Sequence, residues 1–477
     1  MDTIQNIGRN SIAVILGCVA GAVIDSFIVI ILARYFGHYG FGEICFLGIF
    51  FYFFRHIDNF FIRPILVREM SRNVVNADAI IGSGFIIRII FALIAIILMW
   101  TILLFGNHSI DILQLAIFTS ISLVISSMGA SYDIVFQINL KQVYSKFINF
   151  LSKIVTLALL CFVVFLKKDL LFFYVFSTII GIISFFYIRR YAEKFIKLKF
   201  NISFKLWQDI FCKSLPLFIS GIFIFVYHRT DQIMLLQMKG VEAVGSYSAA
   251  VKFAEVFNII PIALVASLLP LMSKCFYSKN EYFEKIYQLS FKYLLLFIIP
   301  VAFGVAIFSD SITVIIYGDN FLSSGLALRF LIWAEVFVFL GIMNNTILVA
   351  ANKQIIDPFL TGISAIANIL LNFIFIPRYG FVGAAATTLV AYAVGPVIGY
   401  FLKTTKKYSL SMLKNFLKPF FASLIMAGFI CYFRFFSWWL IIIAPLIYLF
   451  IMYFIRGVDY NDLRRIKEVI RAKNAAS

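Results

Sequence analysis

Fourteen apolar stretches, each long enough to cross a lipid bilayer as a helix, constrain this chain more than any other feature. The hydrocarbon core of a membrane is about 30 Å thick, and an α-helix crosses it in about 20 residues. The stretches lie at residues 10–36, 40–62, 79–105, 112–137, 145–166, 170–188, 213–236, 245–272, 290–308, 325–350, 357–376, 381–402, 417–434 and 437–455. The segments between them are short, so the sequence predicts an all-α polytopic membrane protein without a soluble domain.

The composition supports this reading and excludes a water-soluble fold. Hydrophobic residues make up 62% of the 477 residues and charged residues 13%, whereas soluble proteins carry about 25% charged residues. The first apolar stretch is too long for the core of a signal peptide, and no small-residue cleavage site follows it. We therefore expect residues 10–36 to form the first transmembrane helix.

The distribution of basic residues predicts the orientation of the chain. Of the 41 Lys and Arg residues, 29 fall on the side of the N-terminus, six on the opposite side and six inside the spans. Because basic loops stay in the cytoplasm, we expect both termini to be cytoplasmic and the protein to be a multi-pass protein of the cell (inner) membrane. The net charge of +18 then reflects topology and attraction to anionic lipids, so no nucleic-acid partner is expected.

The sequence lacks the motifs of disulfide frameworks, metal sites and nucleotide-binding sites. The six Cys residues are isolated and unaccompanied by the four scattered His residues, so neither a disulfide framework nor a metal site is expected. No phosphate-binding loop of the G-x-x-x-x-G-K-[ST] type is present, which argues against direct coupling to ATP. We expect no cofactor, no catalytic residues and no enzymatic activity.

The longest polar stretch divides the spans into groups. Residues 189–213 are rich in Lys and read as a cytoplasmic linker. The predicted organisation is an N-lobe of six spans at 1–188, the linker at 189–213, a C-lobe of six spans at 214–402, and two further spans with a cytoplasmic tail at 403–477.

Two sequence echoes suggest that the lobes are repeats. Gly37 and Gly42 follow the first span as Gly240 and Gly245 follow the seventh, and Lys141-Gln142 follows the fourth span as Lys353-Gln354 follows the tenth. Both echoes are six spans apart, and an even offset preserves the topology. The expected fold is therefore two parallel repeats around a central cavity, related by an axis along the membrane normal.

Four segments resemble a known transporter family. They are LARYFGHYGFGEICF (32–46), PILVREMSR (64–72), RTDQIMLLQMKGVEAVGSYSAAVKFAE (229–255) and PRYGFVGAAATTLVAY (377–392). Together they resemble the Wzx-type polysaccharide flippases of the MOP superfamily over about residues 8–402. The resemblance implies alternating access that carries a polyprenyl-diphosphate-linked oligosaccharide, of an O-antigen, capsule or exopolysaccharide, to the outer leaflet. Membrane lipids and a polysaccharide polymerase of the same pathway are the other partners that it implies.

Basic residues within the spans are the candidates for binding the diphosphate. A charge in the bilayer core costs at least about 2.5–3.5 kcal/mol, so such residues face a protein interior or a wet cavity. The six are Arg55, Arg88, Lys153, Arg229, Lys252 and Arg329. Arg55 and Lys252 each have an acidic residue three positions later and could instead form local ion pairs. Arg88, Lys153 and Arg229 are therefore the preferred candidates.

Acidic residues within the spans are candidates for coupling to an ion gradient. Asp25, Asp231 and Asp133 could each take a proton or Na⁺ in a cavity, although an interhelical ion pair is the alternative role for Asp25 and Asp231. Three other functions remain open: a lipid II flippase, a cation-coupled multidrug antiporter and, less favoured, a membrane polymerase or ligase. The sequence leaves the glycan, the coupling ion and the oligomeric state undetermined.

Overall fold

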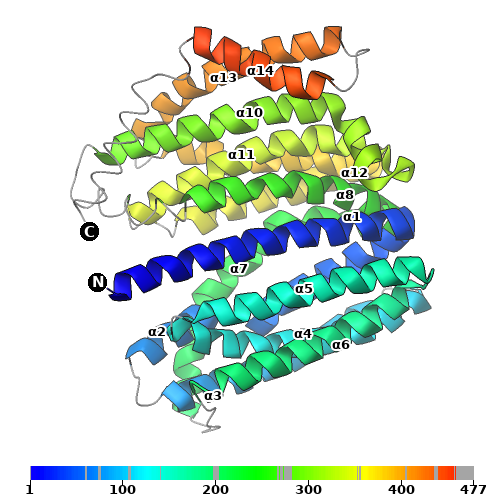
Figure 1. The fold of residues 1–477 in the computed structure, drawn as a ribbon, viewed down its shortest axis with the longest axis vertical. Helices are drawn as coiled ribbons and strands as arrows, with labels where there is room; N and C mark the ends of the chain where they lie inside the picture. The colour runs from blue at the N-terminus through cyan, green and yellow to red at the C-terminus, as the bar shows by residue number, and fades with distance from the viewer. Residues whose placement is uncertain are drawn as a thin grey trace. The chain divides into compact units, whose positions relative to one another are not determined.

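The computed structural model contains α-helices and short 3-10 helices, with no strand among the residues described (Figure 1). These residues are 2–59, 62–72, 77–105, 109–139, 141–196, 204–265, 282–351, 356–402, 406–433 and 439–455, with the isolated positions 268, 272, 353 and 457. The predicted all-α class is confirmed.

The helices are α1 (Asp2–Asn59), α2 (Ile62–Arg72), α3 (Ala77–Phe105), α4 (Ile110–Ile138), α5 (Gln142–Phe165), α6 (Leu170–Ala192), α7 (Phe204–Lys239), α8 (Val241–Glu255), α10 (Tyr282–Tyr317), α11 (Ser324–Ala350), α12 (Ile356–Phe401), α13 (Lys406–Tyr432) and α14 (Trp439–Phe454), with η2 (Val256–Asn258) and η3 (Asp319–Phe321). In the described part of the chain, ten helices are long and apolar enough to cross a membrane. Two of these, α1 and α12, each contain two predicted spans. With α7 and the shorter α14, the total agrees with the fourteen spans predicted.

Glycines divide the two long helices where the sequence placed span boundaries. The backbone leaves helical geometry at Gly37 (φ 65°, ψ −170°) and at Gly380 (φ 57°, ψ −136°). A residue with a Cβ adopts such positive φ values only at a cost, whereas glycine does so freely. A polar contact joins the two halves of α12, since the Thr387 hydroxyl, after Gly380, donates to Asn372, before it. Within the first half, Asn372 donates to Asn368.

Polar caps fix the starts of two membrane helices. The side chain of Ser109 accepts a hydrogen bond from the amide of Ile112 at 3.4 Å, and that of Asp169 accepts one from Phe172 at 3.1 Å. The first amides of a helix have no partner within the helix. These caps therefore satisfy backbone donors where α4 and α6 begin.

By internal contacts the chain forms two compact units. The first comprises residues 1–236 with 240–245, and the second comprises 237–239 with 246–477. In the first unit α1 packs on α3, α4 and α5, and α4 packs on α6. A core of residues including Ile81, Val135 and Phe136 joins its helices. The predicted lobe and linker boundaries stay a prediction.

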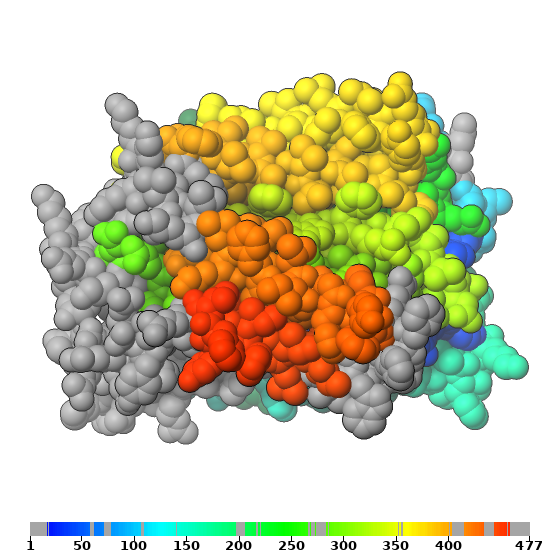
Figure 2. Space-filling view, turned by 90° about the horizontal axis from the view of Figure 1, so that it is seen from above, coloured from blue at the N-terminus to red at the C-terminus, as the bar shows by residue number. Residues whose placement is uncertain are grey.

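In the second unit α11 packs between α10 and α12, while α13 packs on α10 and α14 on α13. Met426, Tyr448 and Met452 form the core of the last two helices, and the Tyr448 hydroxyl donates to the carbonyl of Leu296 at 2.9 Å. Figure 2 shows α13 and α14, in orange and red, on one face of this unit, and exposed residues such as Phe421 and Phe450 lie on these helices. Large exposed apolar side chains suit a surface that faces lipid.

Both sequence echoes have matching backbone geometry. Gly240 adopts a positive φ (85°) as Gly37 does. Asn139, after α4, has φ −83° and ψ 7°, and Ala351, after α11, has φ −83° and ψ 2°. The amides of Lys141 and Lys353 each donate to the carbonyl five residues earlier, at 2.8 and 2.7 Å. These equivalences support the repeat at the level of the backbone.

The first echo also forms a reciprocal close contact within the first unit. A Cβ placed on Gly42 would lie 2.2 Å from the carbonyl oxygen of Val241, and one on Gly245 would lie 2.2 Å from that of His38. His38 follows Gly37 as Val241 follows Gly240, so each repeat supplies the same carbonyl against the same glycine. Only glycine permits backbones to approach this closely.

We expect Gly42→Ala to lower the stability of the protein by about 1–3 kcal/mol, because the obstructing carbonyl belongs to the backbone and cannot rotate away. Gly48→Ala is the matched control on the same helix, since nothing lies within 4 Å of its Cβ. It should leave stability unchanged or raise it slightly, because Ala favours helix over Gly. Thermal unfolding of the two variants in detergent measures the difference, and equal melting temperatures would contradict the contact.

Candidate functional site

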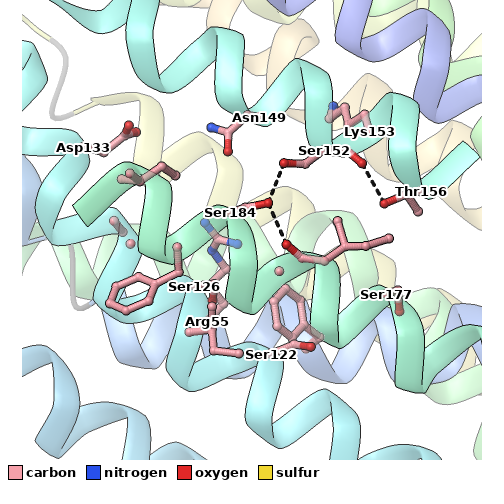
Figure 3. Close-up of a pocket in the computed structure, with 18 of the residues that line it drawn as sticks. Arg55, Ser122, Ser126, Asp133, Asn149, Ser152, Lys153, Thr156, Ser177 and Ser184 are labelled. Atoms are coloured by element: carbon pink, nitrogen blue, oxygen red, sulfur yellow. Dashed lines mark hydrogen bonds between the residues drawn. The ribbon is translucent and has the colours of Figure 1, made fainter. Parts of the chain in front are cut away.

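A cavity of about 420 Å³ lies within the first unit, between helices α4, α5 and α6 and beside α1, α2 and α3 (Figure 3). Its volume falls in the range of small-molecule sites, about 300–1,000 Å³. The polar side chains that line it are Arg55, Arg63, Arg88, Ser122, Ser126, Asp133, Asn149, Ser152, Lys153, Thr156, Ser177 and Ser184.

Helical periodicity brings these residues to the cavity. On α5 the lining positions are Asn149, Ser152, Lys153 and Thr156, which follow the spacing i, i+3, i+4 and i+7. Residues with this spacing share one face of a helix. The lining positions Ser122, Ser126 and Gly129 of α4, and Ser177, Gly181 and Ser184 of α6, likewise follow a helical spacing. Figure 3 shows Ser152 and Ser184 facing one another between α5 and α6, at a hydrogen-bond distance of 2.6 Å.

Four cationic side chains and one carboxylate line the cavity. Arg55 comes from α1, Arg63 from α2, Arg88 from α3 and Lys153 from α5, while Asp133 on α4 is the acidic residue. Arg88 is 1% exposed although it lies within a predicted span. The cavity is therefore electropositive, as an anionic ligand requires.

Lys153 is held at the edge of the cavity by helix α1. Its Nζ lies 2.5 Å from Oδ2 of Asp25 and 3.3 Å from the carbonyl oxygen of Gly21. A Cβ on Gly21 would lie 3.1 Å from this Nζ, so the small residue leaves space for the ammonium group. The side chains of Lys153 and Asp25 are 36% and 53% exposed. This pair is accessible and can therefore exchange partners.

Arg63 and Asp133 form a second pair at the cavity. The guanidinium Nη1 lies 3.6 Å from Oδ2 of Asp133, and Nε donates to Oε1 of Gln137 at 3.0 Å. Arg55, one helical turn after Phe51, has its guanidinium carbon 5.8 Å from the centre of that ring. The cations thus approach the cavity from different helices and with different partners.

The structure brings Arg55, Arg88, Lys153 and Asp133 to this cavity, with Asp25 beside Lys153. Arg229 of α7 instead lies over the ring of Tyr52 of α1, 5.9 Å from its centre. Asp231 is 4% exposed and accepts a hydrogen bond from the amide of Gln232. Neither residue lines the cavity.

The other two predicted basic residues lie in the second unit. Lys252 pairs with Glu255 at 3.8 Å, the local pair that the sequence left open, and Arg329 binds Asp310 and Ser309. The other local pair that the sequence left open is Arg55 with Asp58, and the side chain of Asp58 lies outside the described residues.

Sequence reasoning did not select Arg63 or the hydroxyl residues of the cavity. Arg63 lies just beyond the predicted span at 40–62, where a basic residue indicates topology, and serines within membrane helices are common. The repeated spacing of Ser122, Ser126 and Gly129 on α4, and of Ser177, Gly181 and Ser184 on α6, was the available signal.

Two family profiles match this chain. One, described as "Polysaccharide biosynthesis protein", matches residues 7–276, which is more than half of the chain. The chain belongs to the polysaccharide biosynthesis protein family. A second profile, MatE, matches residues 216–374. The resemblance to the MOP superfamily drawn from the sequence is thereby confirmed.

Two proteins with similar sequences have names that refer to glycan or polysaccharide biosynthesis. A "Probable low-salt glycan biosynthesis flippase Agl15" of Haloferax volcanii is 28% identical over 274 residues, which cover 56% of this chain and 56% of that protein. "Capsular polysaccharide biosynthesis protein CapF" of Staphylococcus aureus is 22% identical over 223 residues, covering 46% of this chain and 56% of CapF. The chain thus matches about half the length of these relatives.

Solved structures support the fold over nearly the whole chain. The lipid II flippase MurJ in an inward closed conformation gives a TM-score of 0.74 at 19% identity, covering 94% of this chain and 99% of MurJ. A multidrug resistance MATE transporter in an inward-facing conformation gives 0.63 at 15% identity, covering 84% and 95%. This multi-pass membrane protein therefore has the fold of the MOP superfamily.

The electropositive character of the cavity can be tested by chemical modification. In a variant without native cysteines, Ser177→Cys should react about five-fold faster with an anionic methanethiosulfonate than with a cationic one, because the cavity concentrates anions. Adding Arg55→Gln should reduce this preference. Ser109→Cys, at the cap of α4 outside the cavity, serves as the reference for the intrinsic reactivity of the reagents. Equal preference at both cysteines would show that the cavity is not electropositive.

Proposed function

We propose that this protein is a flippase that carries a polyprenyl-diphosphate-linked oligosaccharide from the cytoplasmic to the outer leaflet, for O-antigen, capsule or exopolysaccharide assembly. The cavity with four cations and one carboxylate is the observation that carries the proposal. Membership of the polysaccharide biosynthesis family and similarity to Agl15 support it. On this proposal the protein acts as a transporter rather than as an enzyme.

The cations match the chemistry of a diphosphate. A diphosphate carries at least two negative charges, which must find compensating partners when the head group leaves water. Arg donates two parallel hydrogen bonds to a phosphate, whereas Lys acts as a point charge. Arg55 and Arg88 would hold the phosphate oxygens, and Lys153 and Arg63 would join them by exchanging their aspartate partners for the ligand.

The remaining basic candidates act outside this cavity. Arg229 lies against Tyr52, one turn before Arg55 on α1, and would contribute positive potential near the diphosphate. Lys252 and Arg329 would contact the substrate in another access state. Their partners Glu255 and Asp310 neutralise them in the conformation described.

The membrane orientation belongs to the same proposal. Both termini are cytoplasmic and the protein lies in the cell (inner) membrane, as the distribution of basic residues predicts. The lining positions nearest the ends of α4 and α6, Asp133 and Ile188, then lie toward the cytoplasm, where the lipid-linked substrate is made. Applying the cysteine reagents to intact cells and to inverted vesicles tests this side. A polysaccharide polymerase would receive the product.

A lipid II flippase is the second candidate, favoured by the TM-score of 0.74 with MurJ. Lipid II is also a glycan on a polyprenyl diphosphate, so the same cations would serve it. A multidrug antiporter fits less well, because a cationic drug would meet four cations in this cavity. Growth complementation of a lipid II flippase mutant distinguishes the first two candidates.

Replacing Arg55 or Arg88 with Ala should abolish or strongly reduce flipping. Loss of a charge-assisted hydrogen bond costs about 1.5–3 kcal/mol, equivalent to a roughly ten- to hundred-fold weaker hold on the diphosphate. Lys at either position should restore activity in part, because it keeps the charge and loses the bidentate geometry. Protection of a fluorescent lipid-linked oligosaccharide from membrane-impermeant dithionite in proteoliposomes measures the transport.

Arg378→Ala is the matched control, since Arg378 is exposed in the second unit and does not line the cavity. It should flip substrate as the unmodified protein does. Wild-type rates in both Arg55→Ala and Arg88→Ala would refute the diphosphate site.

We further propose that a cation gradient drives the cycle. When a diphosphate takes Lys153 and Arg63, Asp25 and Asp133 lose their cationic partners, and each could then bind H⁺ or Na⁺ instead. Asp231, buried on α7, is the third candidate for this role. The ion must bind one access state more tightly than the other, because equal affinity shifts no equilibrium.

Imposed H⁺ or Na⁺ gradients should therefore change the flipping rate in proteoliposomes. Asp25→Asn should weaken this response while leaving binding of the glycolipid largely intact, because the arginines remain. Glu242→Gln, at the start of α8 and outside the cavity, provides a carboxylate control. A rate that is unchanged when all gradients are collapsed would identify a gradient-independent facilitator.

A further inference from the structure

The cavity contains a second kind of surface that the diphosphate does not use. Six hydroxyl side chains on three consecutive helices line it, and we call them the hydroxyl face: Ser122, Ser126, Ser152, Thr156, Ser177 and Ser184. Hydroxyls are poor partners for lipid tails, and their gathering in one cavity points to a polar ligand.

The protons of most of these hydroxyls are already engaged. Ser126, Thr156 and Ser177 each donate to a carbonyl three or four residues earlier in their own helix, at distances between 2.9 and 3.0 Å. Ser152 and Ser184 lie 2.6 Å apart, so one donates to the other, and the other can donate to the carbonyl four residues earlier in its helix. A hydroxyl has one proton and two lone pairs. With the proton committed, what it offers to the cavity is an acceptor.

An acceptor surface discriminates between the parts of a glycosyl diphosphate. Phosphate oxygens accept hydrogen bonds and gain nothing from further acceptors, whereas the hydroxyl groups of a sugar donate. The cations supply what the diphosphate needs, and the hydroxyl face supplies what a sugar needs.

Contacts between helices show which lining residues lie at the same height along the cavity. Ser122 is level with Thr178 at 3.4 Å, and Ser152 is level with Ser184. Arg63 is level with Asp133 at the other end of the cavity. The lining positions on α4 extend from Ser122 to Asp133, about 16 Å at 1.5 Å per residue. The Arg63–Asp133 pair therefore lies at one end of the cavity and Ser122 at the other, with Lys153 and Ser152 between them.

From this arrangement we infer that the hydroxyl face binds the first sugar of the substrate, the pyranose attached directly to the diphosphate, and selects a neutral sugar over an acidic one. The inference rests on the proposed function, because it places the diphosphate among the arginines. A cavity of about 420 Å³ accommodates a head group of this kind rather than a whole oligosaccharide, and later sugars leave on the open side marked by the exposed Lys153. Once the diphosphate occupies the cations, a sugar carboxylate would meet only acceptors and be disfavoured.

Binding to purified protein in nanodiscs tests this assignment with defined probes. The probes are farnesyl diphosphate, farnesyl diphosphate bearing glucose, the same probe bearing glucuronic acid, and UDP-glucose. One neutral hydrogen bond contributes about two- to ten-fold in affinity. The glucose-bearing probe should therefore bind at least about five-fold more tightly than farnesyl diphosphate, and the glucuronic acid probe more weakly than the glucose probe.

The triple variant Ser126→Ala, Thr156→Val and Ser177→Ala should remove most of the gain from glucose and leave the affinity for farnesyl diphosphate unchanged. Unchanged farnesyl diphosphate binding also shows that the variant folds, and Ser177→Ala alone should lose part of the gain. Thr119→Val is the matched control, because Thr119 makes the same hydrogen bond to Leu115 within α4 and does not line the cavity.

The outcomes separate this inference from the proposed function. A wild-type protein that binds both farnesyl probes equally, or a triple variant that keeps the full gain, would overturn the sugar site alone. Farnesyl diphosphate that binds wild type no better than Arg88→Ala would overturn the diphosphate site and the sugar site with it. UDP-glucose binding as tightly as the farnesyl probe would overturn the assignment to a lipid-linked sugar and identify a site for a soluble nucleotide sugar.

Discussion

The cost of placing a charge in hydrocarbon is the constraint on which this structure depends. Each intramembrane cation must face protein, water or a counter-charge, because lipid offers no compensation. In the first unit a cavity meets that requirement for Arg55, Arg88 and Lys153, which reach it from three helices, whereas Arg229 lies over the ring of Tyr52. The helices between them turn apolar residues such as Ile97 and Ile183 outward. One energetic rule thus determines both the lipid-facing surface and the position of the site.

The second constraint is that backbone N–H and C=O groups in the membrane must form hydrogen bonds within the protein. Glycines at the ends of the spans help to meet it. Chain reversals in a membrane protein must be short, since open backbone groups are costly in lipid. Gly37 and Gly380 allow a change of direction at one residue without a long loop. The reciprocal contacts of Gly42 and Gly245 then join the two repeats at equivalent backbone carbonyls. The same chemistry at the same positions is what a duplicated ancestral segment would leave.

The cavity combines two kinds of ligand recognition, charge attraction and hydrogen bonding, which differ in how strictly they depend on distance and angle. Cations attract a diphosphate over several ångströms and tolerate small displacements, so they can hold the substrate while helices move. Hydrogen bonds to sugar hydroxyls depend on distance and angle and are supplied by side chains fixed to their own helix backbones. Lys153 lies between the two, bound to Asp25 and adjacent in sequence to Ser152. Its exchange of partners would connect substrate binding to the position of α1.

The sequence by itself determined the spans and the breaks between them near Gly37 and Gly380, because hydropathy acts locally. It also required Arg88 to face protein or a wet cavity, because a charge in hydrocarbon is costly. It did not place Arg63 in the site, since a basic residue beyond a span reads as a topology signal until α2 folds against α3 and α4. Nor did it distinguish Arg229, which lies on Tyr52, from Arg88, which lines the cavity. Nor could the hydroxyl face be predicted from the sequence, because serine and threonine are common in membrane helices. Only the packing of α4, α5 and α6 turns these six residues toward one cavity.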